Sequence, residues 1–377
     1  MRFLHTADWH LGRYFHGLHL TDEQRYLIFN ELLPLIKAEK IETVVIAGDI
    51  YDRAVPPVEA VALFDEVLTK LIEQKIKVIY IAGNHDSAKR LQFGSSLLEK
   101  SGVFVQGEIT KKPRSIALDD KFGSIYFSLF PYAEPLAVRQ ALGENSNLDF
   151  NAANEILVRQ ARESLPAKAR TVAIAHAFIA GGSESSSERV ITVGGSGNVS
   201  AKIFADYSYT ALGHLHNPQR AGGENIRYSG SLMKYSFDEA EQSKGVNIVD
   251  ISADGSSQVN FIKLMPRRDV VRLKGTFAEM KKNTSDDFIE IVLTDDGPIL
   301  DGFARLRENY PNLLHLRRES YVKKVSEPLV HGKMVQKSEL ELFEQYYERQ
   351  LNTEMTDEEK ALVTVCINEI EQEERKK

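Results

Sequence analysis

Five groups of polar residues in this sequence hold side chains of the kinds that bind transition metals. In chain order they are Asp8 with His10, Asp49, the run Asn84-His85-Asp86, His176, and His214 with His216. Carboxylate and amide oxygens combined with imidazole nitrogens suit Mn²⁺, Fe²⁺ or Zn²⁺, but neither a thiolate zinc site nor an all-oxygen Ca²⁺ site. Without His85 and Asp86, seven residues remain, enough ligands for two ions if one carboxylate bridges. Two ions about 3.5–4 Å apart suit phosphoester cleavage, because together they clamp the phosphate and activate water.

Each group follows a short apolar run that is typical of a β-strand. The runs cover residues 3–7, 43–47, 77–82, 171–175 and 208–212, and residues 21–40 and 57–74 between the first three have helical spacing. Strand, helix and strand at this rhythm predict buried parallel strands. Because ligands collect beyond the carboxyl ends of strands in such sheets, we expect the five groups to converge.

Taken singly, each group has a simpler explanation. An Asp-x-His pair or a Gly-Asp pair at a strand end often only turns the chain, and a lone histidine such as His176 is more often structural. Gly83-Asn84-His85-Asp86 is much less common, and Gly213-His214-x-His216 is moderately specific. All five in this order, each after a predicted strand, favour the metal site.

The second half of the chain has more strand character and a different ending. Residues 124–130, 227–229, 246–251 and 258–264 read as further strands, and the Gly- and Ser-rich residues 181–197 as a loop. A boundary near residues 265–268 precedes a smaller α+β segment. Ser338 with Glu341, and Thr356 with Glu359, fit capping boxes of two amphipathic helices.

Composition bounds the class of protein. The sequence has 377 residues, 42% of them hydrophobic and 27% charged, which is ordinary for a chain with a real core. It has no apolar run of about 20 residues and no signal-peptide pattern at its start. Cys366 is the only cysteine, which excludes an intrachain disulfide. A single cysteine fits a cytoplasmic protein, and we expect no association with a membrane. The net charge is −7, and residues 335–377 carry 12 acidic against 6 basic side chains, so the remainder is nearly neutral.

The five groups match the signature of the calcineurin-like metallophosphoesterases, and the chain resembles this superfamily over about residues 1–265. The resemblance implies an α/β (α+β) fold, a two-sheet β-sandwich flanked by helices with the metals at one end. It implies that Asp8, His10, Asp49 and His216 hold one ion, and that Asp49, Asn84, His176 and His214 hold the other, with Asp49 as the bridge. It also implies that His85 faces the scissile phosphate as a general acid or charge stabiliser, and that Asp86 helps to orient it.

Flanking residues resemble the SbcD family, the bacterial members of the Mre-type DNA repair nucleases. The similar stretches are residues 5–13, residues 49–53 with Pro56-Pro57, and residues 228–231 followed by Phe237. Protein phosphatases of the superfamily typically have Arg-Gly-Asn-His-Glu at residues 82–86, where this chain has Ala-Gly-Asn-His-Asp, so a phosphoprotein substrate is disfavoured. Archaeal and eukaryotic counterparts carry His where this chain has Asp52, so the role of that His is not transferred.

The second resemblance implies three domains: residues 1–265 as a nuclease, 266–334 as a capping domain that contacts DNA, and 335–377 as helices that bind the coiled-coil base of an SbcC-type ATPase. It implies a homodimer in the bacterial cytoplasm, associated with the nucleoid, that acts with two divalent ions, most simply Mn²⁺. The expected activities are exonuclease action from duplex ends and endonuclease action on single strands and hairpins, in break repair, recombination and replication. Candidate DNA contacts are Arg13, Arg53, Arg267 and Arg268.

Several alternatives stay open from the sequence. The substrate could be a small phosphodiester or a nucleotide, or the chain could be a non-catalytic scaffold. The two C-terminal helices could fold back onto the body. Apolar residues in the helices at 57–74 and 87–99 fit ordinary core packing as well as a dimer surface.

Overall fold

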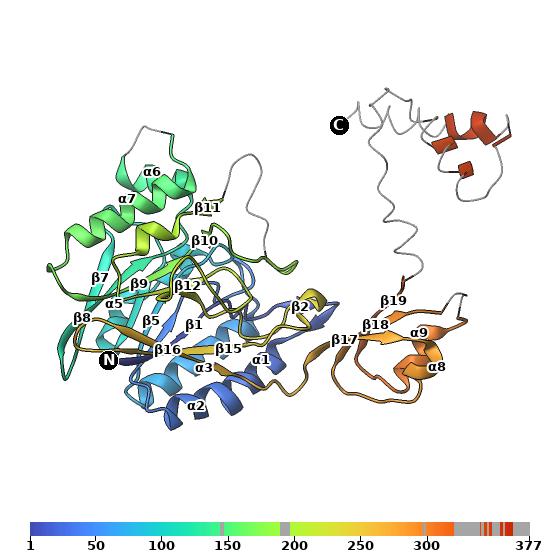
Figure 1. Ribbon diagram of the computed structural model, residues 1–377, viewed down its shortest axis with the longest axis horizontal. Coiled ribbons are helices and arrows are strands. Elements are labelled where there is room, and N and C mark those ends of the chain that lie inside the picture. Colours follow the sequence, from blue (N-terminus) through green and yellow to red (C-terminus); the bar gives the residue numbers. More distant parts are fainter. Residues whose placement is uncertain are drawn as a thin grey trace. The chain divides into compact units, whose positions relative to one another are not determined.

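Two six-stranded sheets dominate the computed structural model (Figure 1), which describes residues 1–143, 147–188, 197–295, 297, 299–319, 340, 343–344, 347–348, 355–356 and 359–364. The chain divides into two compact units, Met1–Arg318 and Glu319–Lys377, which are described separately. Among the described residues, no helix combines the length and apolar character needed to cross a bilayer.

The first sheet has the strand order β16-β15-β1-β4-β5-β6. Strands β1, β4, β5 and β6 run parallel, whereas β15 and β16 are antiparallel additions at one edge. The bounds are β1 Arg2–Thr6, β4 Thr43–Ile46, β5 Lys77–Ile81, β6 Val103–Gln106, β15 Gly245–Ile251 and β16 Ser257–Lys263. The parallel strands therefore end at one shared edge.

The second sheet has the order β13-β14-β12-β9-β8-β7. Its four central strands, β14, β12, β9 and β8, are parallel, and the two edge strands are antiparallel. The bounds are β7 Arg114–Asp120, β8 Gly123–Phe130, β9 Arg170–His176, β12 Tyr209–Gly213, β13 Gln219–Arg220 and β14 Ile226–Tyr228. Two short pairs complete the body: β2 Tyr14–Phe15 with β3 Leu18–His19, and β10 Phe178–Ile179 with β11 Asn198–Val199.

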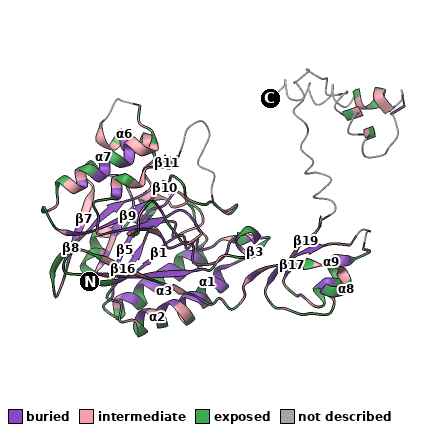
Figure 2. Cartoon of the chain, in the orientation of Figure 1, coloured by how far each residue is buried: buried purple, intermediate pink, exposed green. Residues whose placement is uncertain are grey.

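Helices cover the outer face of each sheet. The core on the outer side of the first sheet includes the long helix α3, and that of the second sheet includes α7. The bounds are α1 Thr21–Leu27, a π-helical stretch Ile28–Leu32, α2 Leu33–Ala38, α3 Val58–Glu73, α4 Ala88–Gln92, α5 Ser95–Leu98, α6 Pro135–Leu142 and α7 Phe150–Glu163, with 3₁₀ turns at Glu99–Ser101, Ala201–Phe204 and Phe237–Glu239. Figure 2 shows buried residues along the strands and exposed ones on the outer sides of these helices.

Side chains alternate between two cores along each strand, because successive residues point to opposite faces. In β4, Val44 packs toward the helices, while Val45 packs into the middle layer between the sheets. In β9, Ile174 enters that middle layer and Ala173 faces α7. The two-sheet sandwich flanked by helices, expected from the resemblance, is confirmed.

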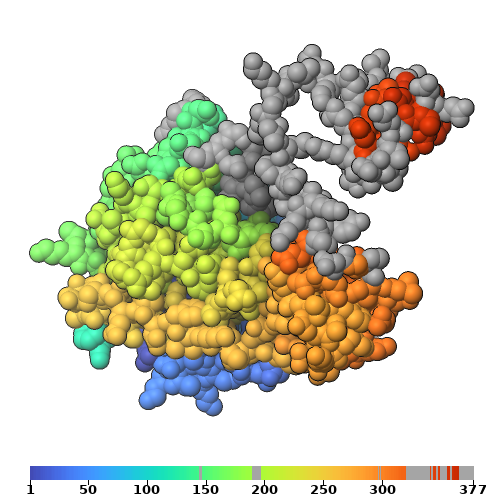
Figure 3. Space-filling model, turned by 45° about the vertical axis from the view of Figure 1, so that its right-hand side comes forward, coloured from blue at the N-terminus to red at the C-terminus, as the bar shows by residue number. Residues whose placement is uncertain are grey.

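A smaller three-stranded segment follows β16. Strands β17 Val270–Gly275, β18 Phe288–Leu293 and β19 Leu313–Arg318 are parallel, and helices α8 Phe277–Met280 and α9 Gly302–Arg307 connect them around a separate small core. Ion pairs join this segment, orange in Figure 3, to the rest of its unit: Arg268 to Glu23 at 2.6 Å and Lys234 to Asp269 at 3.0 Å.

The predicted strands and the helices at residues 21–40 and 57–74 are all present, with ends shifted by a residue or two. In the C-terminal unit the capping box of Thr356 and Glu359 is confirmed, since the carboxylate accepts from Thr356 N–H at 2.8 Å and the hydroxyl accepts from Glu359 N–H at 3.3 Å. The predicted box of Ser338 and Glu341, and much of the loop at 181–197, lie outside the described residues.

Gly213 lies where the two sheets approach each other closely. A Cβ added there would clash with the carbonyl oxygen of Ala47 and come within 2.9 Å of His176 Nδ1. We expect Gly213→Ala to lower the free energy of unfolding by about 1–3 kcal/mol, because a methyl group inserted into a packed interface forces the backbone apart. Urea denaturation in EDTA measures this. The control is Gly297→Ala, where a Cβ meets no atom within 4 Å among the described residues. Equal midpoints for the two variants would contradict the expectation.

Candidate metal centre

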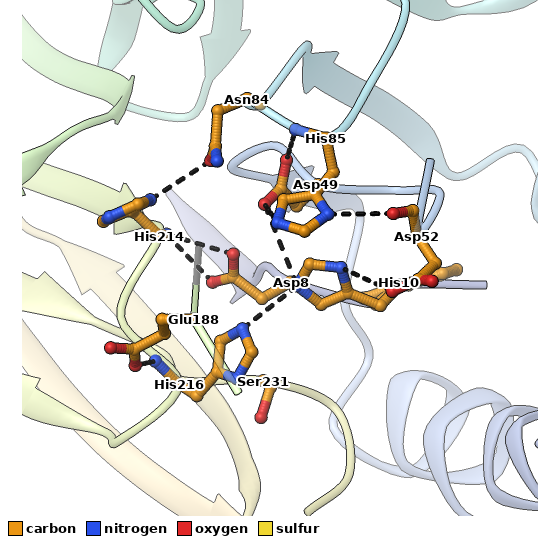
Figure 4. Close-up of polar contacts among 12 residues, drawn as sticks. Asp8, His10, Asp49, Asp52, Asn84, His85, Glu188, His214, His216 and Ser231 are labelled. Atoms are coloured by element: carbon orange, nitrogen blue, oxygen red, sulfur yellow. Dashed lines mark hydrogen bonds and ion pairs between the residues drawn. The ribbon is translucent and has the colours of Figure 1, made fainter. Parts of the chain in front are cut away.

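The structure brings the five polar groups together at the edge where the parallel strands of both sheets end (Figure 4). Asp8 and His10 follow β1, Asp49 follows β4, and Asn84 follows β5. His176 ends β9, while His214 and His216 follow β12. His176 Nδ1–H donates to the carbonyl of Ala47 at 2.8 Å, which ties the second sheet to the first at this edge.

Asp8, His10 and His216 form the first cluster. Each offers a ligand atom, and the three atoms lie within 4.8 Å of one another. The Nε2 atoms of His10 and His216 are 3.0 Å apart, and both rings are buried. His10 Nδ1 is also buried and has no hydrogen-bond partner among the described residues. The Nε2 atoms of His10 and His216 point toward each other beside the Asp8 carboxylate. A cation between them would accept the lone pairs of both nitrogens, so these residues fit a metal ion.

Asp49, Asn84, His176 and His214 form the second cluster. Asn84 Oδ1 lies 2.9 Å from His176 Nε2 and 3.2 Å from His214 Nδ1. His176 Nε2 is also 3.4 Å from the Asp49 carboxylate. Because Nδ1 of His176 already donates to Ala47, its Nε2 is a bare acceptor in the neutral ring and faces only other acceptors. Either a proton on Nε2 or a cation among these atoms gives the acceptors a partner, and the mixed oxygen and imidazole set fits a metal ion. The Asp49 carboxylate lies between the clusters, since it is 3.8 Å from His10 Nε2.

His85 and Asp86 act through different contacts. The Nδ1–H of His85 donates to the main-chain carbonyl of Asp52 at 2.8 Å, which directs Nε2 toward Asp49, 4.0 Å away. Asp86 accepts from the backbone N–H groups of Ile50, Tyr51 and Gly83 at 2.9–3.1 Å. The ring of His85 is thus oriented directly by Asp52, while Asp86 joins the loops that follow β4 and β5.

A second layer of polar residues around His216 was missed from the sequence. Ser187 Oγ lies 2.6 Å from His216 Nδ1 and donates to the buried carboxylate of Glu239. Lys244 Nζ pairs with the same carboxylate at 2.5 Å. The neighbouring Glu188 accepts from the His216 N–H at 2.6 Å. Such partners orient a ligand imidazole and fix its tautomer. No short motif contains them, since Ser187 and Glu188 lie between β10 and β11 in the chain, whereas Glu239 lies between β14 and β15.

Charges within the centre are strongly coupled. Burial alone would raise the pKa of Asp49, but the charge and hydrogen bond of His176, with His10 and His85 nearby, hold it well below its usual value. Burial opposes protonation of His176, yet the Asp49 carboxylate raises the pKa of His176 to about 9. Burial, and then the charge of His176, lowers the pKa of His214 to about 3. Asp49 and His176 thus form an ion pair within the second cluster.

Burial also raises the pKa of Asp8 well above its usual value, and burial together with the charge of Asp49 raises that of Asp86 to about 7. Burial thus opposes ionisation of both carboxyl groups. A divalent ion beside Asp8 would favour the ionised form of that carboxyl while the imidazole ligands stay neutral, the states in which carboxylates and imidazoles bind metal.

The backbone at the ligands is strained. Asp8, His10 and Asp49 have φ angles of 53°, 44° and 50°, and His214 has 113°. Non-glycine residues with positive φ cost about 1–3 kcal/mol each and persist where the surroundings over-determine them. Here parallel loops supply that support, with hydrogen bonds of 3.0 Å from Asp8 N to Gly48 O and from His10 N to Asp49 O.

The arginines predicted to contact DNA are found in different settings. Arg13 pairs with Asp52 at 2.9 Å and donates to the Ser187 carbonyl at 2.9 Å, so it belongs to the wall of the centre. Arg267 and Arg268 both pair with Glu23, at 2.5 and 2.6 Å, where the three-stranded segment meets α1. Arg53 is exposed on the loop after β4.

Two family models and one known nuclease subunit match this chain. The calcineurin-like phosphoesterase family model matches residues 1–218, and the model described as the type 5 capsule protein repressor C-terminal domain matches residues 266–350. The SbcD subunit of nuclease SbcCD from Staphylococcus epidermidis (strain ATCC 12228 / FDA PCI 1200) is 30% identical over 364 residues, covering 95% of this chain and 94% of that protein.

Two solved structures are also similar. A novel archaeal phosphodiesterase is 10% identical with a TM-score of 0.30, covering 70% of this chain and 100% of its own. The calcineurin-like phosphoesterase YfkN from Bacillus subtilis is 14% identical with a TM-score of 0.34. The match covers 71% of this chain and 90% of the YfkN chain. On the family model and the curated relative, this chain belongs to the calcineurin-like phosphoesterases, metal-dependent hydrolases of phosphodiesters, and within them to the SbcD family of nuclease subunits.

Proposed function

We propose that the chain is a Mn²⁺-dependent DNA nuclease that degrades duplexes from their ends and cuts single strands and hairpins. In this proposal it works with an SbcC-type ATPase in DNA break repair, recombination and hairpin removal, in the cytoplasm and close to the nucleoid. The carrying observation is the convergence of seven potential ligands at the joined sheet edges, in a chain similar along 95% of its length to a nuclease subunit.

The two clusters would hold one ion each. Asp8, His10, Asp49 and His216 would bind the first, and Asp49, Asn84, His176 and His214 the second, with Asp49 shared. The mixed oxygen and imidazole set favours Mn²⁺ over Ca²⁺. When bound, two such ions clamp the phosphate, activate water and offset the charge of an in-line displacement.

His85 is suited to act on the substrate rather than on an ion. Its side chain is 14% exposed, whereas His10, His176 and His216 are at most 1% exposed. Its Nδ1–H is held by the Asp52 carbonyl, so Nε2 is the atom that can hold a proton toward the scissile phosphate. We assign it the role of general acid or charge stabiliser, with Asp52 and Asp86 keeping the loop in place.

The surfaces that would bind a second copy of the chain, DNA and the ATPase are formed by other segments than the metal ligands. Apolar side chains on α3, on α5 and directly after α4 are exposed, including Phe93 at 87% and Leu97 at 71%, and they support a homodimer formed through this region. Residues 266–334 would be the capping domain and contact DNA. Residues 335–377 would bind the coiled-coil base of the ATPase.

Mn²⁺-dependent release of nucleotides from hairpin DNA tests the activity, compared with hydrolysis of the chromogenic diester bis(p-nitrophenyl) phosphate. We expect both reactions, and we expect Asp49→Ala to lose bound metal in elemental analysis together with at least about a hundredfold of activity, because the bridge serves both ions. Cleavage of the small diester without DNA cleavage, with the ATPase present, would indicate a small-molecule phosphodiesterase. Full function of Asp49→Ala would indicate a scaffold.

His85→Ala separates the proposed proton donor from the ligands. We expect it to keep both metal ions and to lower kcat on DNA by about 10²–10⁴-fold, the usual contribution of a general acid. Metal content by elemental analysis and single-turnover rates are the two measurements. The matched control is His19→Ala, an exposed histidine on β3. A parallel fall in metal content and rate would reassign His85 as a ligand.

Removal of residues 335–377 tests the site of ATPase binding. We expect the shortened chain to lose capture by an SbcC-type ATPase in a pull-down, while its metal content and its hydrolysis of bis(p-nitrophenyl) phosphate match those of the full chain. Undiminished capture would place the partner surface elsewhere.

A further inference from the structure

A second cavity lies beside the metal centre, one strand further along the same sheet edge. Strand β8 runs parallel to β9 with Phe130 opposite Ala175, so the residues after Phe130 emerge next to His176. Tyr132 is the second of these. Its N–H donates to the Ala82 carbonyl at 2.9 Å, and its ring centroid is 6.3 Å from that of His176. Tyr132 therefore forms a wall shared with the metal centre.

The cavity beyond this wall has a volume of about 380 Å³ and is built from the end of β8, helix α6 and the start of α7. Pockets that hold small ligands begin at roughly 300 Å³. The rings of Tyr132 and Phe150, with centroids 5.8 Å apart, form the aromatic side of the cavity. Leu136 adds an exposed apolar rim.

Arg139 supplies the charge of the cavity. Its Nε is buried and has no hydrogen-bond partner among the described residues. A buried donor without a partner is costly, and a guanidinium meets that need best with the paired oxygens of a phosphate or carboxylate. Glu134 also lines the cavity, but it is exposed, so solvent screens its charge. Aromatic faces beside an arginine are the combination that binds nucleotides of a single strand, by stacking and phosphate pairing.

We propose that this cavity is a subsite for one deoxynucleotide of the strand being cut. Its base lies against Tyr132 or Phe150, and a backbone phosphate pairs with Arg139. The inference rests on the proposed nuclease function, which it deepens by adding a contact next to the scissile phosphate. Since Tyr132 lines the cavity and its ring packs against that of His176, a nucleotide held here lies next to the metal centre.

Direct binding tests the subsite without catalysis. The full chain in EDTA is titrated with the 5′-phosphorylated dinucleotide pdTpdT, and binding is followed by equilibrium dialysis. We expect saturable binding that Arg139→Gln weakens about tenfold, the effect of one lost charge-assisted hydrogen bond. Phe150→Leu, which keeps an apolar side chain but removes the ring, should weaken it several-fold. The matched control, Arg159→Gln, changes an exposed arginine of α7 that does not line the cavity and should bind like the parent.

No binding by the parent chain, or equal affinities of the parent and Arg139→Gln, would overturn the subsite. Unfolding midpoints of the variants show whether they are folded, and the two cavity variants act through different chemistry, so one misfolded variant does not decide the outcome.

Catalysis distinguishes failure of the subsite from failure of the nuclease proposal. With Mn²⁺ and an oligonucleotide, Arg139→Gln is expected to raise KM about tenfold, in line with the binding loss. An unchanged KM alongside normal DNA cleavage overturns the subsite alone. If the parent chain cleaves no DNA yet binds pdTpdT through Arg139, the nucleotide subsite stands and the DNA substrate is wrong.

Discussion

The junction of the two sheets at the carboxyl ends of their parallel strands is the constraint on which the rest depends. At that junction the His176 ring donates across to Ala47 of the first sheet, and Gly213 leaves no room for a side chain between them. Asp8 completes the connection by accepting from the His214 N–H at 3.0 Å. Because ligands come from both sheets, neither sheet alone holds a complete cluster. The spacing of the sheets, set by the apolar layer between them, thus determines the spacing of the ligands.

The same junction concentrates buried polar groups whose burial costs free energy of folding, a cost that bound cations would reduce. Four ligands have strained backbone, two carboxylates are desolvated, and imidazole nitrogens face other acceptors. Ion binding compensates each of these costs at once, since a cation partners the lone pairs and favours the ionised carboxylates. Ligands that bind only the folded chain add to its stability by mass action. Binding of divalent ions at this edge would therefore also stabilise the folded chain.

Much of this arrangement could be predicted from sequence because it has local signatures. Each parallel strand is a short apolar run that ends at the polar ligand, so both the strand and the residue leaving it are readable, as with residues 43–47 and Asp49. The fold and the convergence of the five groups followed from that rule and from the family resemblance. Helices α6 and α7 were not predicted individually, and neither was the cavity beside them, since a cavity depends on how distant segments pack.

The residues that could not be predicted act through contacts of long sequence separation. Glu239 reaches His216 through Ser187, and Asp52 orients His85 through a main-chain carbonyl, which no side-chain pattern can reveal. Asp86 illustrates the converse. The family resemblance implies that Asp86 helps to orient His85, and the structure shows its carboxylate accepting from three backbone N–H groups of the loops after β4 and β5.

The three-stranded segment is attached to the loop that carries the metal ligands, and this gives the centre a mechanical connection beyond its own strands. Phe288 of β18 belongs to the main core and packs near Phe15, with ring centroids 6.3 Å apart. Phe15 follows His10 by five residues, and Gln24 on α1 donates to the His10 carbonyl at 2.8 Å. The neighbouring Glu23 holds Arg267 and Arg268. One short stretch, from His10 to Gln24, thus contacts both the first cluster and the segment.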